Sequence, residues 1–202
     1  GELEEPETFQ EAFAGPEKDE WKDSYGKEVM NFIKRKCWKK VPKKVPRQMK
    51  RKIIRTKDVF KKKSEFDNSI RFKTRICSKG FMQVPGKDYT ESFSPVACDD
   101  TVRMLLCIYL YFVDGVNMSF LGVKGVNYEL KFEVELVDIE AAFLEGDMDK
   151  KTFIELPEGM VALGFITVEE REEYCIQLLK SMYGNVDAAL KLFKTYKKHI
   201  TK

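Results

Sequence analysis

One acidic residue lies where a carboxylate could ligate a metal ion. Asp138 ends a predicted strand whose apolar residues are Val134, Leu136 and Val137, and it precedes two alanines and Phe143. A carboxylate at the end of a strand can bind a hard cation through its oxygens. An acid in this position is also a common turn residue. The spacing by itself leaves both interpretations open.

Positively charged residues between positions 69 and 78 form a second candidate site. Ile70, Phe72, Thr74 and Ile76 alternate there with Arg71, Lys73 and Arg75. This period of two predicts a β-strand with the cations on one face. Neighbouring like charges repel one another unless an anion lies against them. The face is therefore either a solvated outer surface or a binding surface for a polyanion such as nucleic acid.

The elements around these residues follow from their own patterns. Residues 52–63 predict the partner strand of a hairpin, and Asp67-Asn68 predicts its turn. Helical spacing predicts helices over 17–38, 101–113 and 186–199. The remaining short strands are predicted over 132–139, 152–156 and 174–183. Without a regular β-α-β alternation, this order favours an α+β fold.

Two of the predicted helices carry further expectations. The helix over 101–113 is apolar enough to be buried, with Asp99 or Asp100 as its cap. The helix over 186–199 is amphipathic, and its pattern directs three side chains inward: Leu190, Phe193 and Tyr196.

The charge of the chain is strongly segregated. Residues 34–79 hold 20 Lys or Arg and three acids, whereas the whole chain has a net charge of only +3. Within this block, residues 39–46 read KKVPKKVP, which predicts extended chain. This repeat is either a charged linker or a patch for nuclear import or phosphate binding. Residues 1–16 are acidic and contain Pro6 and Pro16, so we expect a loose lead-in.

The composition excludes several classes of protein. Of the 202 residues 43% are hydrophobic, which is enough for a core and excludes a disordered tail. No apolar run approaches the roughly 20 residues that a membrane span needs. The five cysteines form no CxxC pair and there is one histidine, which excludes a common zinc site. Reduced thiols fit a cytosolic or nuclear compartment.

Eight segments, in order, resemble the reverse transcriptase of copia-type LTR retrotransposons. Each segment alone is a weak signal, and the specificity lies in their combination. Four of them are RFKTR with SKGFMQ (71–75 and 78–83), GKDY with ESFSPV (86–89 and 91–96), DIEAAFLEG (138–146) and LKSMYG (179–184). The others are Trp38 with Val41-Pro42, VFKKK (59–63), TVR (101–103) and IELPEGM (154–160). Together they extend over nearly the whole chain.

This resemblance implies a right-hand polymerase fold of the α+β class, with fingers and a partial palm. It implies an acidic lead-in over 1–16, fingers with the basic hairpin over 17–113, an insertion over 114–136 and a partial palm over 137–202. The insertion is indicated by unusual length and by the duplicated Gly-Val-Asn at 115–117 and 125–127.

The resemblance also implies roles for single residues. Asp138, with the carbonyl of Ile139, would hold Mg²⁺ for nucleotidyl transfer to a primer 3′-hydroxyl. Phe143 lies where the family has an aromatic residue that excludes ribonucleotides, although a core role is equally consistent. The implied partners are an RNA template, a DNA primer and a dNTP, with the rest of a Gag-Pol polyprotein. The hairpin cations that would contact them are Lys61, Lys63, Arg71, Lys73 and Arg75.

The sequence also departs from the family. No Asp-Asp pair follows Asp138, so two of the three metal-binding carboxylates of the Tyr/Phe-x-Asp-Asp type are missing, and residues 185–189 differ from the family's LKQAPR. We therefore expect a polymerase fragment that is inactive alone, in a cytoplasmic particle or the nucleus. The alternatives are a non-catalytic nucleic-acid-binding module and a decayed relic that does not fold stably.

Overall fold

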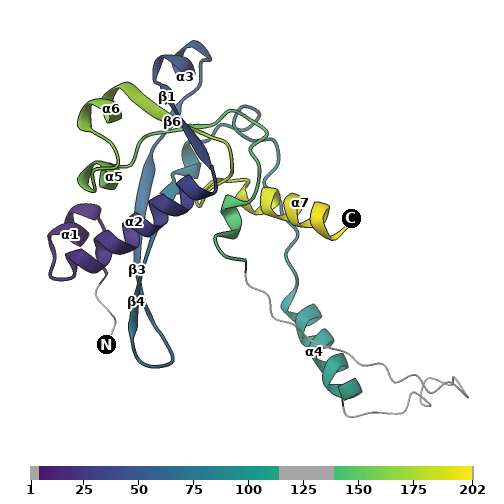
Figure 1. The fold of residues 1–202 in the computed structure, drawn as a ribbon. Coiled ribbons are helices and arrows are strands. Elements are labelled where there is room, and N and C mark those ends of the chain that lie inside the picture. Colours follow the sequence, from purple (N-terminus) through teal and green to yellow (C-terminus); the bar gives the residue numbers. More distant parts are fainter. Residues whose placement is uncertain (1–4, 114–138, 202) are drawn as a thin grey trace, which may run out of the picture. The chain divides into compact units, whose positions relative to one another are not determined.

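The computed structural model describes residues 5–113 and 139–201. The chain divides into two compact units, one made of residues 1–94 and 141–202 and the other of residues 95–140. The first unit contains both helices and strands (Figure 1). Most of the predicted site residues lie in this unit. Each unit is considered by itself below.

The first unit is α+β in content, as the sequence predicts. Its helices are α1 (Phe9–Ala14), α2 (Lys18–Lys34), α3 (Lys44–Gln48), α5 (Glu158–Ala162), α6 (Val168–Glu173) and α7 (Ala188–Ile200), with the 3₁₀ turns η1 (Gly80–Met82) and η3 (Ala142–Leu144). Its strands are β1 (Trp38–Pro42), β2 (Ile53–Ile54), β3 (Thr56–Ser64), β4 (Ile70–Ser78), β5 (Phe153–Ile154) and β6 (Tyr174–Leu178).

These strands form two sheets. A mixed four-stranded sheet has the order β1-β6-β5-β2, in which only the β2–β5 pair is parallel. β3 and β4 form the predicted antiparallel hairpin, with Thr56 opposite Ser78 and Ser64 opposite Ile70. The predicted strand over 52–63 was wrong at its start, because Ile53 and Ile54 belong to the other sheet, where they pair with β5.

The hairpin turn forms as the sequence predicts. Asn68 adopts a left-handed φ of 62°, a conformation that asparagine tolerates well. The Asp67 carboxylate accepts a hydrogen bond from the Ser69 N–H at 2.9 Å. A short polar side chain that binds the backbone two residues on is the usual chemistry of such turns.

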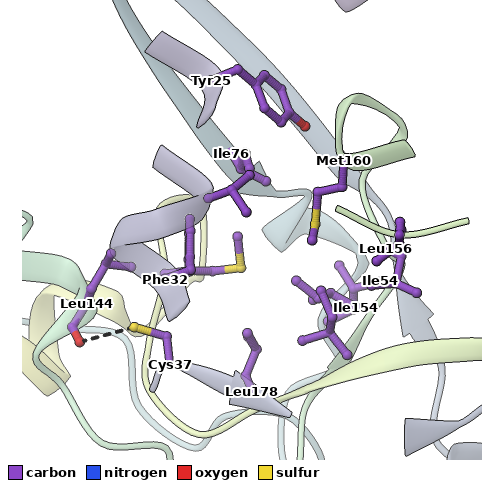
Figure 2. Close-up of a cluster of buried hydrophobic side chains, with 14 of the residues drawn as sticks. Tyr25, Phe32, Cys37, Ile54, Ile76, Leu144, Ile154, Leu156, Met160 and Leu178 are labelled. Carbon is purple, nitrogen blue, oxygen red and sulfur yellow. Dashed lines mark hydrogen bonds between the residues drawn. The ribbon is translucent and has the colours of Figure 1, made fainter. Parts of the chain in front are cut away.

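Helix α2 covers the apolar face of the hairpin. Trp21 is 2% exposed and packs edge-on against the rings of Phe60 and Phe72 at 5.3 and 4.7 Å. The Ser24 hydroxyl donates to the Phe72 carbonyl at 3.2 Å, which satisfies an acceptor on β4. The core continues from α2 through Phe32 to Ile154 and Leu178 of the four-stranded sheet (Figure 2).

The two KKVP copies adopt different structures, so the predicted extended chain is confirmed for residues 39–42 and was wrong for the second copy. The first copy lies in β1, an edge strand paired with β6, where Pro42 costs no ladder hydrogen bond within the sheet. The second copy enters α3, and Pro46 lies in its first turn, where a missing N–H is tolerated. The neighbouring strands, and not the four-residue sequence KKVP, therefore decide which conformation each copy adopts.

Other predictions need correction in the first unit. The acidic lead-in is not loose throughout, because Thr8 caps α1 and Ala12 is buried. α7 is confirmed and buries Leu190, but Tyr196 is 51% exposed and does not point inward. The strand over 174–183 is confirmed only for its first half, β6.

The second unit contains α4 (Asp99–Val113), which confirms the predicted helix. Its burial was predicted wrongly: Val102, Met104, Leu105 and Leu110 are between 45% and 62% exposed. Asp99 and Asp100 lie within the first turn, so neither is the cap residue. Their negative charges still interact favourably with the positive end of the helix dipole. The predicted insertion over 114–136 and the strand over 132–138 lie outside the described residues.

Candidate nucleic-acid interface

The register of the hairpin brings the five predicted cations onto one face. Lys61 lies opposite Lys73, Lys63 opposite Arg71, and Val59 opposite Arg75. Residues directly opposite each other in an antiparallel pair project to the same side. We call these five residues the cationic face: Lys61, Lys63, Arg71, Lys73 and Arg75.

Lys62 lies on the opposite face of the same strand. Its side chain is 9% exposed and pairs with Glu17 at 2.7 Å. Its ammonium group also lies 5.8 Å from the centre of the Phe72 ring. Of the three consecutive lysines at 61–63, the middle one therefore belongs to the packing between α2 and the hairpin.

Acids pair with part of the cationic face. Arg71 pairs with Glu65 at 2.5 Å, and Lys61 pairs with Glu5. Within the described residues, Lys63 and Lys73 have no ion pair. Arg75 has no ion pair among them either, and its guanidinium lies over the Tyr183 ring instead. Three of the five cations on this face therefore lack a paired acid.

The neighbouring cations affect the pKa of Lys73. Partial burial lowers the pKa of its ammonium group, and the positive charges of Arg75, Lys63 and Arg71 lower it further. A bound phosphate would relieve this repulsion.

A buried acid lies behind β4. Glu28 of α2 is 8% exposed, and burial raises the pKa of its carboxyl to about 7. A hydrogen bond from the Ile76 backbone and the charges of Arg75 and Lys73 favour its ionised form. Its Oε1 atom has no hydrogen-bond partner among the described residues. Nearby, the Tyr25 hydroxyl donates to Asp58 at 3.2 Å, and burial raises the pKa of Asp58 to about 6.

Arg75 and Phe143, two predicted site residues from distant parts of the chain, both contact Tyr183. The Arg75 guanidinium lies over the ring of Tyr183 at 4.9 Å. Phe143 of η3 also packs edge-on against this ring, with the ring centres 5.6 Å apart. Burial raises the pKa of the Tyr183 phenol. Sequence reasoning did not select Tyr183, and its place in the LKSMYG motif was the only available signal.

The segment after Tyr183 packs against the end of the hairpin. The Ser78 N–H donates to the Tyr183 carbonyl at 2.8 Å, and the Ser78 hydroxyl donates to Asn185 at 2.5 Å. Gly184 has φ of 85°, and a Cβ there would collide with the Ser78 carbonyl. A Cβ at Gly80 would collide with Gly184 in turn. Both glycines are therefore required by close backbone approach.

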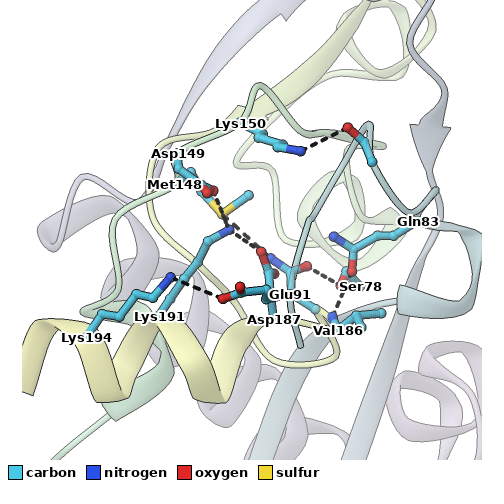
Figure 3. Close-up of polar contacts among 12 residues, drawn as sticks. Ser78, Gln83, Glu91, Met148, Asp149, Lys150, Val186, Asp187, Lys191 and Lys194 are labelled. Carbon is cyan, nitrogen blue, oxygen red and sulfur yellow. Dashed lines mark hydrogen bonds and ion pairs between the residues drawn. The ribbon is translucent and has the colours of Figure 1, made fainter. Parts of the chain in front are cut away.

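Gln83 completes this junction between the two motifs. Its side-chain oxygen accepts a hydrogen bond from the Val186 N–H at 2.7 Å (Figure 3). The SKGFMQ and LKSMYG motifs therefore form one structural unit, although about a hundred residues separate them in the chain.

The segment that departs from the family has its own ion pairs. Lys191, which is 7% exposed, pairs with Asp187 at 2.5 Å and with Asp149 at 3.1 Å (Figure 3). Asp187 is buried at the start of α7, and its Oδ1 atom has no hydrogen-bond partner among the described residues. This cluster stabilises α7 against the 146–149 loop.

The predicted metal site is not described in full. Asp138 lies outside the described residues, and Ile139 is 40% exposed. Within residues 5–113 and 139–201, no group of three His, Cys, Asp or Glu side chains could hold a metal ion. The described residues therefore do not fit a two-Mg²⁺ centre.

The chain belongs to the reverse transcriptase (RNA-dependent DNA polymerase) family, whose profile matches residues 36–202. This match includes both strands of the hairpin, the Gly80–Gly184 junction and η3. No solved structure matches the chain. Among the described helices, none is both long and apolar enough to cross a membrane.

The chain is also homologous to copia-type retrotransposon proteins. It is 30% identical over 183 residues to the retrovirus-related Pol polyprotein from transposon TNT 1-94 of Nicotiana tabacum, a match covering 89% of this chain and 12% of that protein. It is 29% identical to the corresponding proteins from transposons RE2 and RE1 of Arabidopsis thaliana, over 89% of this chain and 10% of each. The chain thus spans about a tenth of the length of these relatives.

Proposed function

We propose that this chain forms the fingers and the first part of the palm of an RNA-directed DNA polymerase from a copia-type Pol polyprotein. Residues 17–113 form the fingers in this proposal, and residues 137–202 form the partial palm. Its ligands are a primed RNA template and a dNTP. The observation that carries the proposal is the hairpin register, which gathers five cations on one face.

The cationic face contacts phosphate groups. Lys63, Lys73 and Arg75, which have no ion pair among the described residues, provide the uncompensated charge, and Lys61 and Arg71 extend it. Such contacts release counterions from the nucleic acid, which makes affinity depend steeply on salt. Phosphates of a bound nucleotide would also be held in line for reaction by fixed cations.

Arg75 and Phe143 contribute to one nucleotide site. Their shared contact with Tyr183 supports this assignment, because it joins the hairpin to η3. In the proposal, Arg75 contacts the triphosphate and Phe143 contacts the sugar.

Asp138, with the Ile139 carbonyl, is the proposed Mg²⁺ ligand on the evidence of the DIEAAFLEG motif alone. Mg²⁺ is the ion that reverse transcriptases generally use, and it would supply charge stabilisation for nucleotidyl transfer. Because no Asp-Asp pair follows Asp138, we expect no primer extension from these 202 residues by themselves. Extension that is abolished in Asp138→Asn would contradict this expectation.

The nucleic-acid part of the proposal is tested by salt-dependent binding. Fluorescence anisotropy would measure the affinity for a primed RNA template over a range of salt concentrations. Replacing Lys63, Arg71 and Lys73 together by alanine should reduce the slope of log K against log salt by roughly two to three. The matched control replaces Lys194, Lys197 and Lys198 of α7, and its slope should not change. An unchanged slope in the hairpin variant would refute the proposal.

A further inference from the structure

We propose that α3 and the residues after it form a second phosphate-binding surface for the same nucleic acid, separate from the cationic face. We call it the α3 surface, and its residues are Lys44, Arg47, Lys50 and Lys52. The identity of the ligand rests on the proposed function, whereas the surface itself follows from the structure.

All the charged residues in the sequence around α3 are basic. Residues 34–52 contain eleven Lys or Arg and no acid. Three of the eleven pair with acids from elsewhere in the unit: Arg35 with Glu145, Lys40 with Glu170, and Arg51 with Asp88. These three cations have structural partners and are not available to a ligand.

The four cations of the α3 surface differ from those three. Their side chains are all exposed. In the part of the chain that the structure describes, none of them takes part in an ion pair. Closely spaced like charges without acids repel one another, and a phosphate backbone would relieve this repulsion.

The backbone holds these cations in a fixed arrangement. Pro46 is buried, and the Lys43 N–H donates to the Glu173 carbonyl at 2.9 Å, which attaches the start of the segment to α6. After the helix, the Arg51 N–H donates to the Pro46 carbonyl at 2.9 Å, with Lys50 in the left-handed region at φ of 51°. A fixed set of charges loses less conformational entropy on binding than a flexible tail does.

The geometry of α3 favours a nucleic acid over a membrane. Lys44 and Arg47 are three residues apart, so they lie on the same side of the helix. A helix that binds a membrane surface needs a broad apolar face. Apart from the two cations, the exposed residue within α3 is Gln48.

The α3 surface is separate from the cationic face. α3 connects β1 and β2 of the four-stranded sheet, whereas the cationic face belongs to the β3–β4 hairpin. Within the first unit, α3 lies at the end opposite the β3–β4 turn (Figure 1). A ligand that contacts both surfaces must therefore be long, and a short ligand can occupy only one of them.

Because the two surfaces are separate, the affinities for a long and a short nucleic acid should respond differently to substitutions in the α3 surface. The variant Lys44→Ala/Arg47→Ala/Lys52→Ala retains Lys50, whose backbone is left-handed. For a primed RNA template of about 30 nucleotides, it should lower the salt slope by roughly two to three and the affinity by roughly tenfold or more. For an oligonucleotide of about six nucleotides, the affinity should change by about twofold or less, because the hairpin alone binds it.

Controls separate this inference from a folding defect and from the proposed function. Thermal melting monitored by circular dichroism should be the same for the variant and the parent chain. The α7 variant, which replaces Lys194, Lys197 and Lys198, removes the same charge elsewhere and should leave the salt slope unchanged.

Each other outcome has a definite meaning. If the hairpin variant loses affinity and the α3 variant behaves like the α7 control, the inference is wrong and the proposed function stands. If neither variant loses affinity, both are wrong. If the α3 variant binds RNA normally but no longer binds phosphatidylserine vesicles that the parent chain binds, the surface serves a membrane and the inference is overturned.

Discussion

The two faces of the β3–β4 hairpin differ in what they contact. One face packs Phe60 and Phe72 against Trp21 of α2, and even its lysine, Lys62, is neutralised there by Glu17. The other face gathers five cations, of which Lys63, Lys73 and Arg75 have no ion pair among the described residues. Packing therefore uses one side of the two strands, and the binding proposed above would use the other.

This division shows how a strand can carry charge without losing its fold. The apolar face buries aromatic area against α2, which offsets repulsion among the cations on the other face. The two faces should therefore respond independently to substitution. Substitutions on each face test that independence.

Replacing Trp21 by alanine should lower the free energy of unfolding by about 3–5 kcal/mol, because it removes a buried ring between two aromatic partners. The salt slope for RNA binding by the folded fraction should not change. Urea unfolding and anisotropy would measure the two quantities. Trp21→Phe should show a smaller loss, and a loss below about 1 kcal/mol in Trp21→Ala would contradict the packing described.

Replacing Glu28 by glutamine should stabilise the fold at high pH. Burial raises the pKa of Glu28 from 4.5 to about 7, so the folded state binds a proton that the unfolded state has lost. Stability therefore falls as the pH rises from about 4.5 to 7, and the substitution removes that loss.

The expected gain from Glu28→Gln is about 3 kcal/mol at pH 8 and close to zero at pH 4. Urea unfolding at both pH values would measure it. Glu20→Gln, at an exposed position of the same helix, is the control and should have little effect at either pH. An equal gain at both pH values would show that Glu28 does not titrate as described.

Lys62 and Lys63 provide a matched pair on opposite faces. Lys62→Ala should cost about 1 kcal/mol of stability, through loss of the Glu17 ion pair and the contact with the Phe72 ring, and leave the salt slope unchanged. Lys63→Ala should lower the salt slope by about one and leave stability unchanged. The same response from both variants would contradict the division between the faces.

Replacing Asp138 by asparagine should have the smallest effect on binding. We expect the affinity for a primed RNA template to change by about twofold or less, with or without Mg²⁺, because the phosphate contacts are made by cations. Anisotropy titrations would measure this. A large loss that appears only with Mg²⁺ would show that the metal site itself holds the nucleic acid.

Much of the local structure was predictable from the sequence. The alternation at 70–76, the Asp67-Asn68 turn and the helical spacing in α2 and α7 are properties of neighbouring residues, and the structure confirms them. The family was also predictable, because its motifs are short and keep their order along the chain. The two KKVP copies were not, since identical residues form a strand in one place and a helix in the other.

The cationic face of the hairpin could be predicted from residue order alone, because the period of a strand specifies which residues project together. The partners of those cations could not, because they come from other segments of the folded chain. Glu17 pairs with Lys62 and Glu5 pairs with Lys61, whereas Tyr183, more than a hundred residues after Arg75, contacts both Arg75 and Phe143. Contacts between distant segments depend on how the elements pack, and no local pattern records that packing.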